Sequence, residues 1–219
     1  MYTVVSLRED SHERGEACLP MRTSYTVSFW GIVCADLRRY GGGVSIKSFV
    51  RQYLLTPGFK YSFWMRLANH LRGISLIWRP AYYLSRVILH RCSVRYGISI
   101  PYNTRIGSGL YIGHHGGIVI NNGVVIGHDC NINHGVTIGV KYGGRSPGVP
   151  VIGDRVYLGP GCKVIGGISL GNDVAVGANA VVVESIPASA IAAGVPAKVI
   201  SFKGSSEYVV NTQTDQGAE

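Results

Sequence analysis

The chain has 219 residues, 46% of them hydrophobic, so it is long enough for one sizeable domain with a buried core. Its formal net charge of +9 favours an anionic partner such as a phosphorylated ligand or a membrane surface. The longest apolar stretch, residues 74–89, contains two arginines and a proline, which excludes a membrane-spanning helix there. Five cysteines without a C-x-x-C pair, and no secretory leader pattern, predict a reducing compartment, and we expect the cytoplasm.

The first part of the chain predicts a tail followed by helices. Residues 1–24 mix charged and polar side chains without any period, which indicates a flexible tail. Residues 25–97 have helical spacing. Ser45 follows three glycines as a candidate N-cap, "TPGF" interrupts the pattern, and Pro80 lies at the start of a further helix.

A basic, aromatic block lies within this helical region. No Asp or Glu occurs between Leu37 and His128. The block's basic residues are Lys47, Arg51, Lys60, Arg66, Arg72, Arg79, Arg86, Arg91 and Arg95, and its aromatic residues are Phe49, Tyr53, Phe59, Tyr61, Phe63, Trp64, Trp78, Tyr82 and Tyr83. One interpretation is peripheral contact with an anionic membrane at its inner face. The other is that the aromatic side chains pack helix on helix and the arginines are solvated. We expect no nucleic-acid partner.

From Ile98 a period of six residues replaces the helical spacing. The recurring aliphatic positions are Ile100, Ile106, Ile112 and Ile118, then Ile126, Ile132 and Ile138, then Ile152, Leu158, Val164, Leu170, Val176 and Val182. Such a period is typical of a parallel β-helix, in which each unit is a short strand and a turn. We therefore predict a mainly β fold, with the β-helix over residues 98–200 and a C-terminal tail over residues 201–219.

Two breaks in phase interrupt the repeat. One lies between Ile112 and Ile126, where "IGHHGGIVI" contains two adjacent histidines. The other is residues 140–151, which we predict to be a loop that leaves the coil, and loops on rigid scaffolds often carry function. Cys130 and Cys162 occupy inward positions of the repeat and are predicted to be core residues.

The stretches "GIVI", "GVTIG", "VIGDRVYLGPGCKVIGGISLGNDVAVGANAVVVESIP" and "AAGVPAKVI" resemble the left-handed β-helix acyltransferases, and most closely the serine acetyltransferase branch. The helical block with its "TPGF" resembles sugar O-acetyltransferases of bacterial surface polysaccharide synthesis. The resemblance implies a left-handed β-helix, a homotrimer, acetyl-CoA as the acetyl donor, active sites in the grooves between neighbouring β-helices, and no metal.

The resemblance also implies which residues catalyse the reaction. The family's general-base histidine falls on His114 in "GHHGGIV". Imidazole titrates near neutral pH and can take the proton of an attacking hydroxyl. His115 and His134 are expected to support it, His134 because it lies one coil further along the chain. The family's partner aspartate falls on Ser99, so Asp129 is the nearest acid that could orient the base.

The chain differs from the family at a second place, and this difference predicts the acetyl acceptor. Aligned through Pro150, the Arg-His pair that binds serine falls on Gly148 and Val149. Because a bidentate arginine is the natural ligand for a carboxylate, its loss predicts a neutral acceptor, a sugar hydroxyl of a polysaccharide precursor or lipid-linked saccharide. Arg145 and Asn121 are the candidate acceptor-binding residues.

The resemblance places the coenzyme at five positions: Gly139, Pro160, Lys163, Gly194 and Lys198. The glycines permit close backbone approach, and the lysines are candidates for the coenzyme's phosphates. Three alternatives to a sugar acetyltransferase stay open at this point. They are a serine O-acetyltransferase of cysteine biosynthesis, a β-helix resembling γ-carbonic anhydrases with zinc held by histidines, and a scaffold without catalytic activity.

Overall fold

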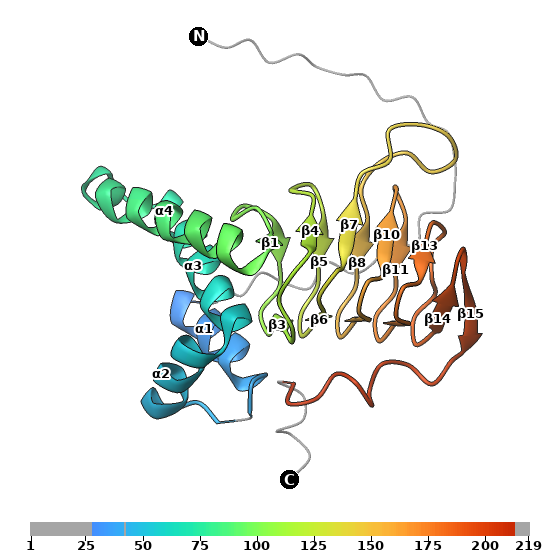
Figure 1. Cartoon of the computed structure of the whole chain (residues 1–219), viewed down its shortest axis with the longest axis horizontal. Helices are drawn as coiled ribbons and strands as arrows, with labels where there is room; N and C mark the ends of the chain where they lie inside the picture. The colour runs from blue at the N-terminus through green and yellow to red at the C-terminus, as the bar shows by residue number, and fades with distance from the viewer. Residues whose placement is uncertain (1–27, 42, 213–219) are drawn as a thin grey trace.

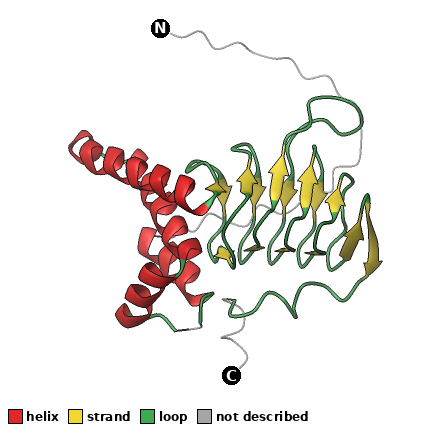
Figure 2. Ribbon diagram, viewed as in Figure 1, coloured by secondary structure: helices red, strands yellow, loops and turns green. Residues whose placement is uncertain are grey.

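The computed structural model describes residues 28–41 and 43–212. The expected tail over residues 1–24 and the end of the expected C-terminal tail, residues 213–219, lie outside the described residues. Helices form one end of the molecule and short strands the rest (Figures 1 and 2). The helices are α1 (Phe29–Arg38), α2 (Ile46–Leu55), α3 (Pro57–Arg72), the 3-10 helix η1 (Leu76–Trp78) and α4 (Arg79–Tyr96).

The strands form three sheets that run along the β-helix, and each full coil contributes one strand to each sheet. Sheet A contains β1 (Ile98–Ser99), β4 (Ile118–Ile120), β7 (Thr137–Gly139), β10 (Lys163–Ile165) and β13 (Val181–Val182). Sheet B contains β2 (Arg105–Ile106), β5 (Val125–Ile126), β8 (Val151–Ile152) and β11 (Ser169–Leu170). Sheet C contains β3 (Tyr111–Ile112), β6 (Asn131–Ile132), β9 (Tyr157–Leu158), β12 (Ala175–Val176), β14 (Ile191–Gly194) and β15 (Ala197–Ser201). The pairings are parallel except for β14 with β15, which are antiparallel.

Three rows of turns connect the sheets, and we name them by the sheets that they join. The CA corner comprises residues 113–117, 133–136, 159–162 and 177–180; the BC corner comprises residues 107–110, 127–130, 153–156 and 171–174; and the AB corner includes residues 121–124 and 140–150. Because consecutive coils are in register, a feature of one turn lies directly above its equivalent in the next coil.

The inward aliphatic residues form the core of the β-helix. Ile112, Ile132, Leu158 and Val176 are paired in register down sheet C, and all four side chains are fully buried. The predicted period of six is therefore confirmed as a parallel β-helix. Cys130 and Cys162 lie in the same core, and burial raises the pKa of each thiol to about 12, as expected for core residues rather than nucleophiles.

The helices pack around α3 and form a second, smaller core. Ser45 caps α2, with its hydroxyl accepting a hydrogen bond from the backbone N–H of Ser48 at 3.1 Å. The small core contains Val33, Leu37 and Phe59, with the partly buried Phe29, Tyr40, Phe49, Tyr53 and Phe63 packed against it. A membrane interpretation of the whole aromatic block is therefore wrong, because most of these rings pack edge to face against one another between the helices.

A buried ion pair joins the helices to the first coil. The guanidinium of Arg66 contacts the carboxylate of Asp36 at 3.1 Å and donates to the backbone carbonyl of Ile106 at 2.6 Å. The same carboxylate accepts a hydrogen bond from the N–H of Leu110 at 2.9 Å. The Tyr61 hydroxyl donates to the carbonyl of Ile100 at 2.8 Å. The helical region thus closes the open end of the β-helix by satisfying backbone groups of its first coil.

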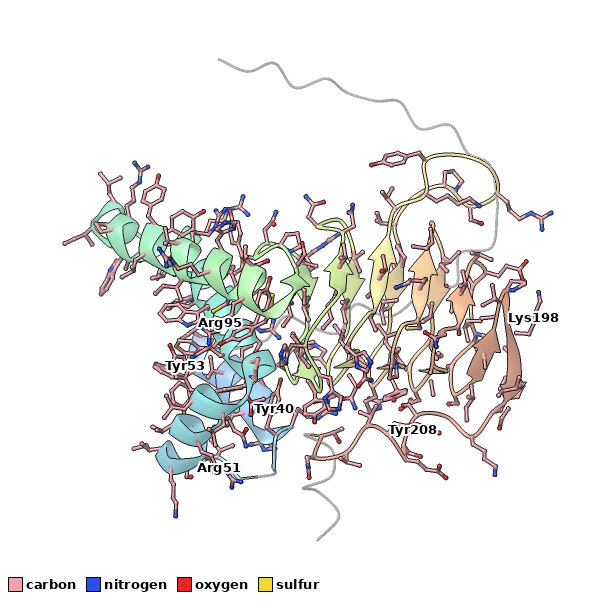
Figure 3. The ribbon with its side chains drawn as sticks, viewed as in Figure 1. Tyr40, Arg51, Tyr53, Arg95, Lys198 and Tyr208 are labelled. Carbon is pink, nitrogen blue, oxygen red and sulfur yellow. The ribbon has the colours of Figure 1, made fainter. Side chains whose placement is uncertain are left out.

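Residues 202–212, which we call the strap, run back from β15 beside sheet C toward the helices (Figure 1). The Tyr208 ring, labelled in Figure 3, stacks on Tyr157 with 4.6 Å between ring centroids. The side-chain amide of Asn131 donates to the carbonyl of Tyr208, and Arg39 of the helical region donates to the carbonyl of Val210 at 2.9 Å. The strap therefore connects the last coil to the helical end.

Candidate active site

The CA corner positions the two histidines that the sequence singled out. Gly117, Gly135 and Gly161 stack on one another with φ angles of +65°, +70° and +73°. A Cβ atom on Gly135 would lie 3.2 Å from the Cα of Gly161, so glycine serves both the left-handed backbone and the close stacking of coils. His114 and His134 precede these glycines in consecutive turns, and both side chains are exposed.

The imidazoles of His114 and His134 face each other at this corner. Their ring centroids are 5.8 Å apart, and the ring planes are inclined by 75°. The turns that carry them are joined by backbone hydrogen bonds, from Gly135 N–H to the Gly116 carbonyl at 2.7 Å and from Gly161 N–H to the His134 carbonyl at 2.9 Å. The structure thus brings together two of the predicted catalytic residues, held by rigid turns and accessible from solvent.

His115 and Asp129, which the sequence also suggested, do not join this pair. The His115 ring packs edge-on against Tyr96 at the end of α4, with 5.7 Å between centroids. Asp129 lies at the BC corner, the opposite end of the sheet C strands, where its buried carboxylate is 3.8 Å from the guanidinium of Arg39. The expectation that Asp129 orients His114 is therefore wrong within one chain, because Asp129 instead pairs with Arg39, where the helical region meets the coils.

Ser99 occupies the position of the expected partner acid. It pairs in register with Val119 on sheet A. Its exposed side chain lines a cavity of about 250 Å³ together with Tyr61, Arg86, Leu89, His90, Ser93, Ile100, Pro101 and Tyr102. Among the described residues, none that lines this cavity has a carboxylate, so none of them replaces the family's acid there.

Two of the predicted coenzyme residues lie at or beside the CA corner. Pro160 is one coil beyond His134, and its carbonyl accepts a hydrogen bond from Asn179 N–H at 2.8 Å. The ammonium of Lys163, on β10, donates to the carbonyl of Gly135, which directly follows His134. The sequence suggested a phosphate ligand at Lys163, but it gave no sign that this lysine contacts the turn that carries His134.

The outer face of sheet A contains a second group of predicted residues. Gly139 and Asn121 line one hollow of about 590 Å³, together with Pro101, Val119, Ile120, Asn122, Thr137, Ile138, Val140 and Ile165. A Cβ on Gly139 would lie 3.0 Å from the Cδ1 atom of Ile165, so the absence of a side chain keeps this wall open. The hollow extends toward the AB corner, where the sheet A strands end.

Arg145 lies in the long loop at the AB corner. Lys141 and Gly148 pair across the base of the loop, and the ammonium of Lys141 donates to the carbonyl of Arg145 at 2.7 Å. The loop projects from the end of β7, whereas the CA corner lies before the start of the sheet A strands (Figure 1). Within one chain, therefore, Arg145 and His114 are at opposite ends of these strands.

Gly194 and Lys198 lie at the far end of the β-helix, in the hairpin of β14 and β15. The Lys198 ammonium is 3.4 Å from a carboxylate oxygen of Glu184, and both side chains are exposed. Four strand spacings of sheet C, or about 19 Å, separate β3 from β14 along the coil axis. These residues therefore do not contact the histidines of their own chain.

The chemistry available at the CA corner is that of imidazole. An exposed histidine on a rigid turn can accept a proton from a hydroxyl and return it to a leaving group. The glycine-rich turns beside it present backbone N–H groups that suit a developing oxyanion. Among the described residues, no three His, Cys, Asp or Glu side chains converge as a metal site would require. In the part of the chain that the structure describes, no helix has the length and hydropathy to span a bilayer.

Comparisons with known proteins agree on one family. The model of the bacterial transferase hexapeptide, with six repeats, matches residues 150–183. The serine acetyltransferase of Helicobacter pylori strain J99 is 38% identical over 148 residues, which cover 68% of this chain and 84% of that protein. The serine acetyltransferase of Mycobacterium tuberculosis is 40% identical over 148 residues, covering 66% of this chain and 61% of that protein.

Solved structures give the same result. The serine acetyltransferase of Neisseria gonorrhoeae in complex with serine has a TM-score of 0.63 and 31% identity, with 78% of this chain and 68% of that chain covered. The enzyme from Brucella abortus in complex with coenzyme A has a TM-score of 0.68 and 27% identity, with 81% and 70% covered. Both contain the parallel β-helix with helices before it, as this chain does.

These relatives overturn the expectation of a sugar acceptor, because the proteins that match over most of their length are serine acetyltransferases. The expectation rested on Gly148 and Val149 replacing the family's Arg-His pair. The same loop nevertheless carries two cations, Lys141 and Arg145, so the missing pair does not remove positive charge from it. The predicted acyltransferase class is confirmed. With a relative 38% identical along 84% of its length, the chain belongs to the serine acetyltransferase family of hexapeptide-repeat enzymes.

Proposed function

We propose that this chain is a serine O-acetyltransferase that transfers the acetyl group of acetyl-CoA to the hydroxyl of L-serine. The observation that carries the proposal is the exposed imidazole of His114 beside His134, at one corner of a β-helix whose relatives are serine acetyltransferases. Complexes of relatives with serine and with coenzyme A support both substrates. The product would be O-acetylserine.

His114 is the general base in this proposal. It accepts the proton of the serine hydroxyl while the hydroxyl oxygen attacks the thioester carbonyl carbon. The carbon–sulfur bond then breaks, and the imidazolium returns the proton to the departing thiolate of coenzyme A. His134, whose ring packs edge-on against His114, restrains the orientation of the base in place of the missing aspartate. Backbone N–H groups of the adjacent turns stabilise the oxyanion.

The complete site is proposed to form between chains of a homotrimer. The loop that contains Arg145 projects from the opposite end of the sheet A strands, so a serine held by His114 meets such a loop only from a neighbouring chain. In this arrangement the loop cations bind the serine carboxylate. Gly139 and the open face of sheet A receive the pantetheine arm, and Pro160, Lys163, Gly194 and Lys198 lie toward the nucleotide end of the coenzyme.

The experiment that tests the function is a thiol-release assay with acetyl-CoA and a set of acceptors. L-Serine should saturate the enzyme, with O-acetylserine identified by mass spectrometry. L-Serine methyl ester, which lacks the carboxylate charge, should be a poor acceptor, and simple sugars and sugar nucleotides should give no release above background. Failure of L-serine to accelerate thiol release, with coenzyme A binding intact, would refute the proposal.

We also propose that the enzyme works in the cytoplasm and makes peripheral contact with the inner face of the plasma membrane. The contact is confined to one part of the helical region, because the remaining aromatic side chains pack between the helices.

A further inference from the structure

The connection between α3 and α4 exposes consecutive apolar side chains. Residues 72–80 are all exposed, and within them Leu76, Ile77 and Trp78 are 68%, 81% and 52% accessible. We call residues 72–80 the tip. In Figure 1 the tip is the end of the α3–α4 hairpin that points away from the β-helix. Stability of the monomer gains nothing from large aliphatic and aromatic side chains left in water at such a position.

A hollow lies directly beside these apolar side chains. It has a volume of about 320 Å³ and is lined by Leu71, Arg72, Ile74, Leu76, Arg79, Tyr82 and Tyr83. The hollow therefore combines two guanidinium groups and two phenol rings with aliphatic side chains. Guanidinium groups bind phosphate oxygens in bidentate fashion, and Tyr and Trp favour the boundary between water and hydrocarbon.

A third arginine, Arg86, contacts the tyrosines in the wall of this hollow. Arg86 donates to the Tyr82 hydroxyl at 2.9 Å, and its guanidinium lies 4.1 Å from the centroid of the Tyr102 ring. The Tyr82 and Tyr102 hydroxyls are 3.1 Å apart. This network fixes the Tyr82 ring in the wall of the hollow, so the site is partly ordered before any ligand arrives.

The charged side chains of the two hairpin helices, α3 and α4, all carry positive charge. The sequence has no Asp or Glu from residue 37 to residue 128, so neither hairpin helix supplies a carboxylate to Arg72 or Arg79. An anionic surface would complement this charge. Contact of the tip with the tip of a second copy is disfavoured, because it would bring four guanidinium groups together without any carboxylate from the hairpins.

We propose that the tip binds the surface of an anionic phospholipid membrane. Leu76, Ile77 and Trp78 enter the boundary between headgroups and acyl chains, and Arg72 and Arg79 bind lipid phosphodiesters at the hollow. Apolar insertion and electrostatic attraction to anionic lipid act together in this kind of contact. The proposal does not depend on the identity of the acetyl acceptor, since the tip is remote from the CA corner.

The first test is co-sedimentation of the full-length protein with vesicles of phosphatidylglycerol and phosphatidylcholine at low salt. Ile77→Glu should weaken binding about tenfold or more, because a charge replaces an inserted side chain. Removing Arg72 and Arg79 by substitution with alanine should weaken it about fivefold for each arginine. Phe202→Glu is the matched control, since Phe202 is 66% exposed at the opposite end of the β-helix, and it should bind as the wild type does.

Depth of insertion gives a second readout. Lipids with brominated acyl chains should quench tryptophan fluorescence of the wild type, and this quenching should disappear in Trp78→Phe although Trp30 and Trp64 remain. Circular dichroism and coenzyme A binding verify that the variants fold. Equal binding of wild type and Ile77→Glu would overturn the proposal. So would absence of lipid binding combined with a lower molecular mass for Ile77→Glu in light scattering, because the tip would then be a contact between copies.

Discussion

The rings of His114 and His134 pack edge to face across one step of the coil, with 5.8 Å between their centroids. Each histidine precedes a left-handed glycine in a turn that is hydrogen-bonded to the next turn. The rigid backbone of the turns therefore sets the distance between the two imidazoles before any substrate binds. This arrangement makes separate predictions for the two residues.

His114→Ala should lower kcat about 10²- to 10⁴-fold, the usual contribution of a general base. Coenzyme A binding and the oligomeric state should not change, because the side chain is exposed and lies outside the buried core of the β-helix. His134→Asn should reduce kcat less and should also change the pH profile of kcat/KM, because it acts through His114. Steady-state kinetics across pH measure both. Near-normal turnover of His114→Ala would show that another group is the base.

Arg145→Ala should raise the KM for L-serine about tenfold to a hundredfold while leaving the KM for acetyl-CoA unchanged, because a charged ligand to the carboxylate is lost. The matched control is Tyr142→Ala, which changes another exposed residue of the same loop, one without charge. Initial rates at varied serine concentration measure the effect. An unchanged KM for serine in Arg145→Ala would assign the carboxylate to another cation, and Lys141→Ala would then be the variant to assay.

Mixed oligomers of His114→Ala and Arg145→Ala should regain activity if the site forms between chains. Random trimers made from equal amounts of the two variants would contain both intact residues at about one quarter of their sites. The assay uses serine well below its KM, where each variant alone has low activity. If mixing after unfolding and refolding gave no gain over the separate variants, His114 and Arg145 would not share an intersubunit site.

Asp36→Asn should lower the free energy of unfolding by about 3–5 kcal/mol, because it leaves the buried guanidinium of Arg66 without its counter-charge. Asp173→Asn is the control. It removes a partly exposed pair with Arg155 at 2.6 Å and should cost about 0–1 kcal/mol. Urea denaturation of both variants gives the comparison. Equal losses would indicate that the joint between helices and coils contributes no more than a surface contact.

Cys130 and Cys162 should resist alkylation by iodoacetamide at pH 8 in the native protein, because burial raises the pKa of both thiols to about 12. The unfolded chain ionises its thiols near pH 9, so the native state binds more protons above that pH. The free energy of unfolding should therefore fall as pH rises from about 9 toward 12. Mass spectrometry of alkylated peptides, native against unfolded, checks the first part. Rapid native labelling at these two positions would contradict their burial.

The period of six was sufficient to predict the β-helix because each aliphatic residue contacts its equivalent in the next coil. Ile112, Ile132 and Leu158 are such a column, and their spacing is visible in the sequence alone. The histidine pair could be predicted for the same reason, since consecutive turns stack. Contacts that do not follow the repeat could not be predicted. Asp129 was nearest to His114 in sequence among the acids, yet its partner is Arg39, which directly follows α1 in the helical region.

The acceptor was predicted wrongly because it was inferred from two aligned positions in a loop that does not follow the repeat. Outside the repeat, residue-by-residue alignment loses its physical basis, since no stacking fixes which residue takes which place. The location of the aromatic side chains was predicted only in part, because the sequence does not show which of them are buried. Composition alone does not separate Phe59, which is fully buried, from Trp78, which is exposed.

The strap determines which contacts of the helical region can form only at the end of chain synthesis. Arg39 leaves the ribosome early, but one of its partners, the carbonyl of Val210, belongs to the last part of the described chain. Coils can stack one after another as they emerge, because each needs only its predecessor. The contact between Arg39 and the strap can form only after the whole β-helix has been synthesised. A nascent chain that stops before Tyr208 would keep its coils but would lack the strap's contacts with Asn131 and Arg39 at the first coils.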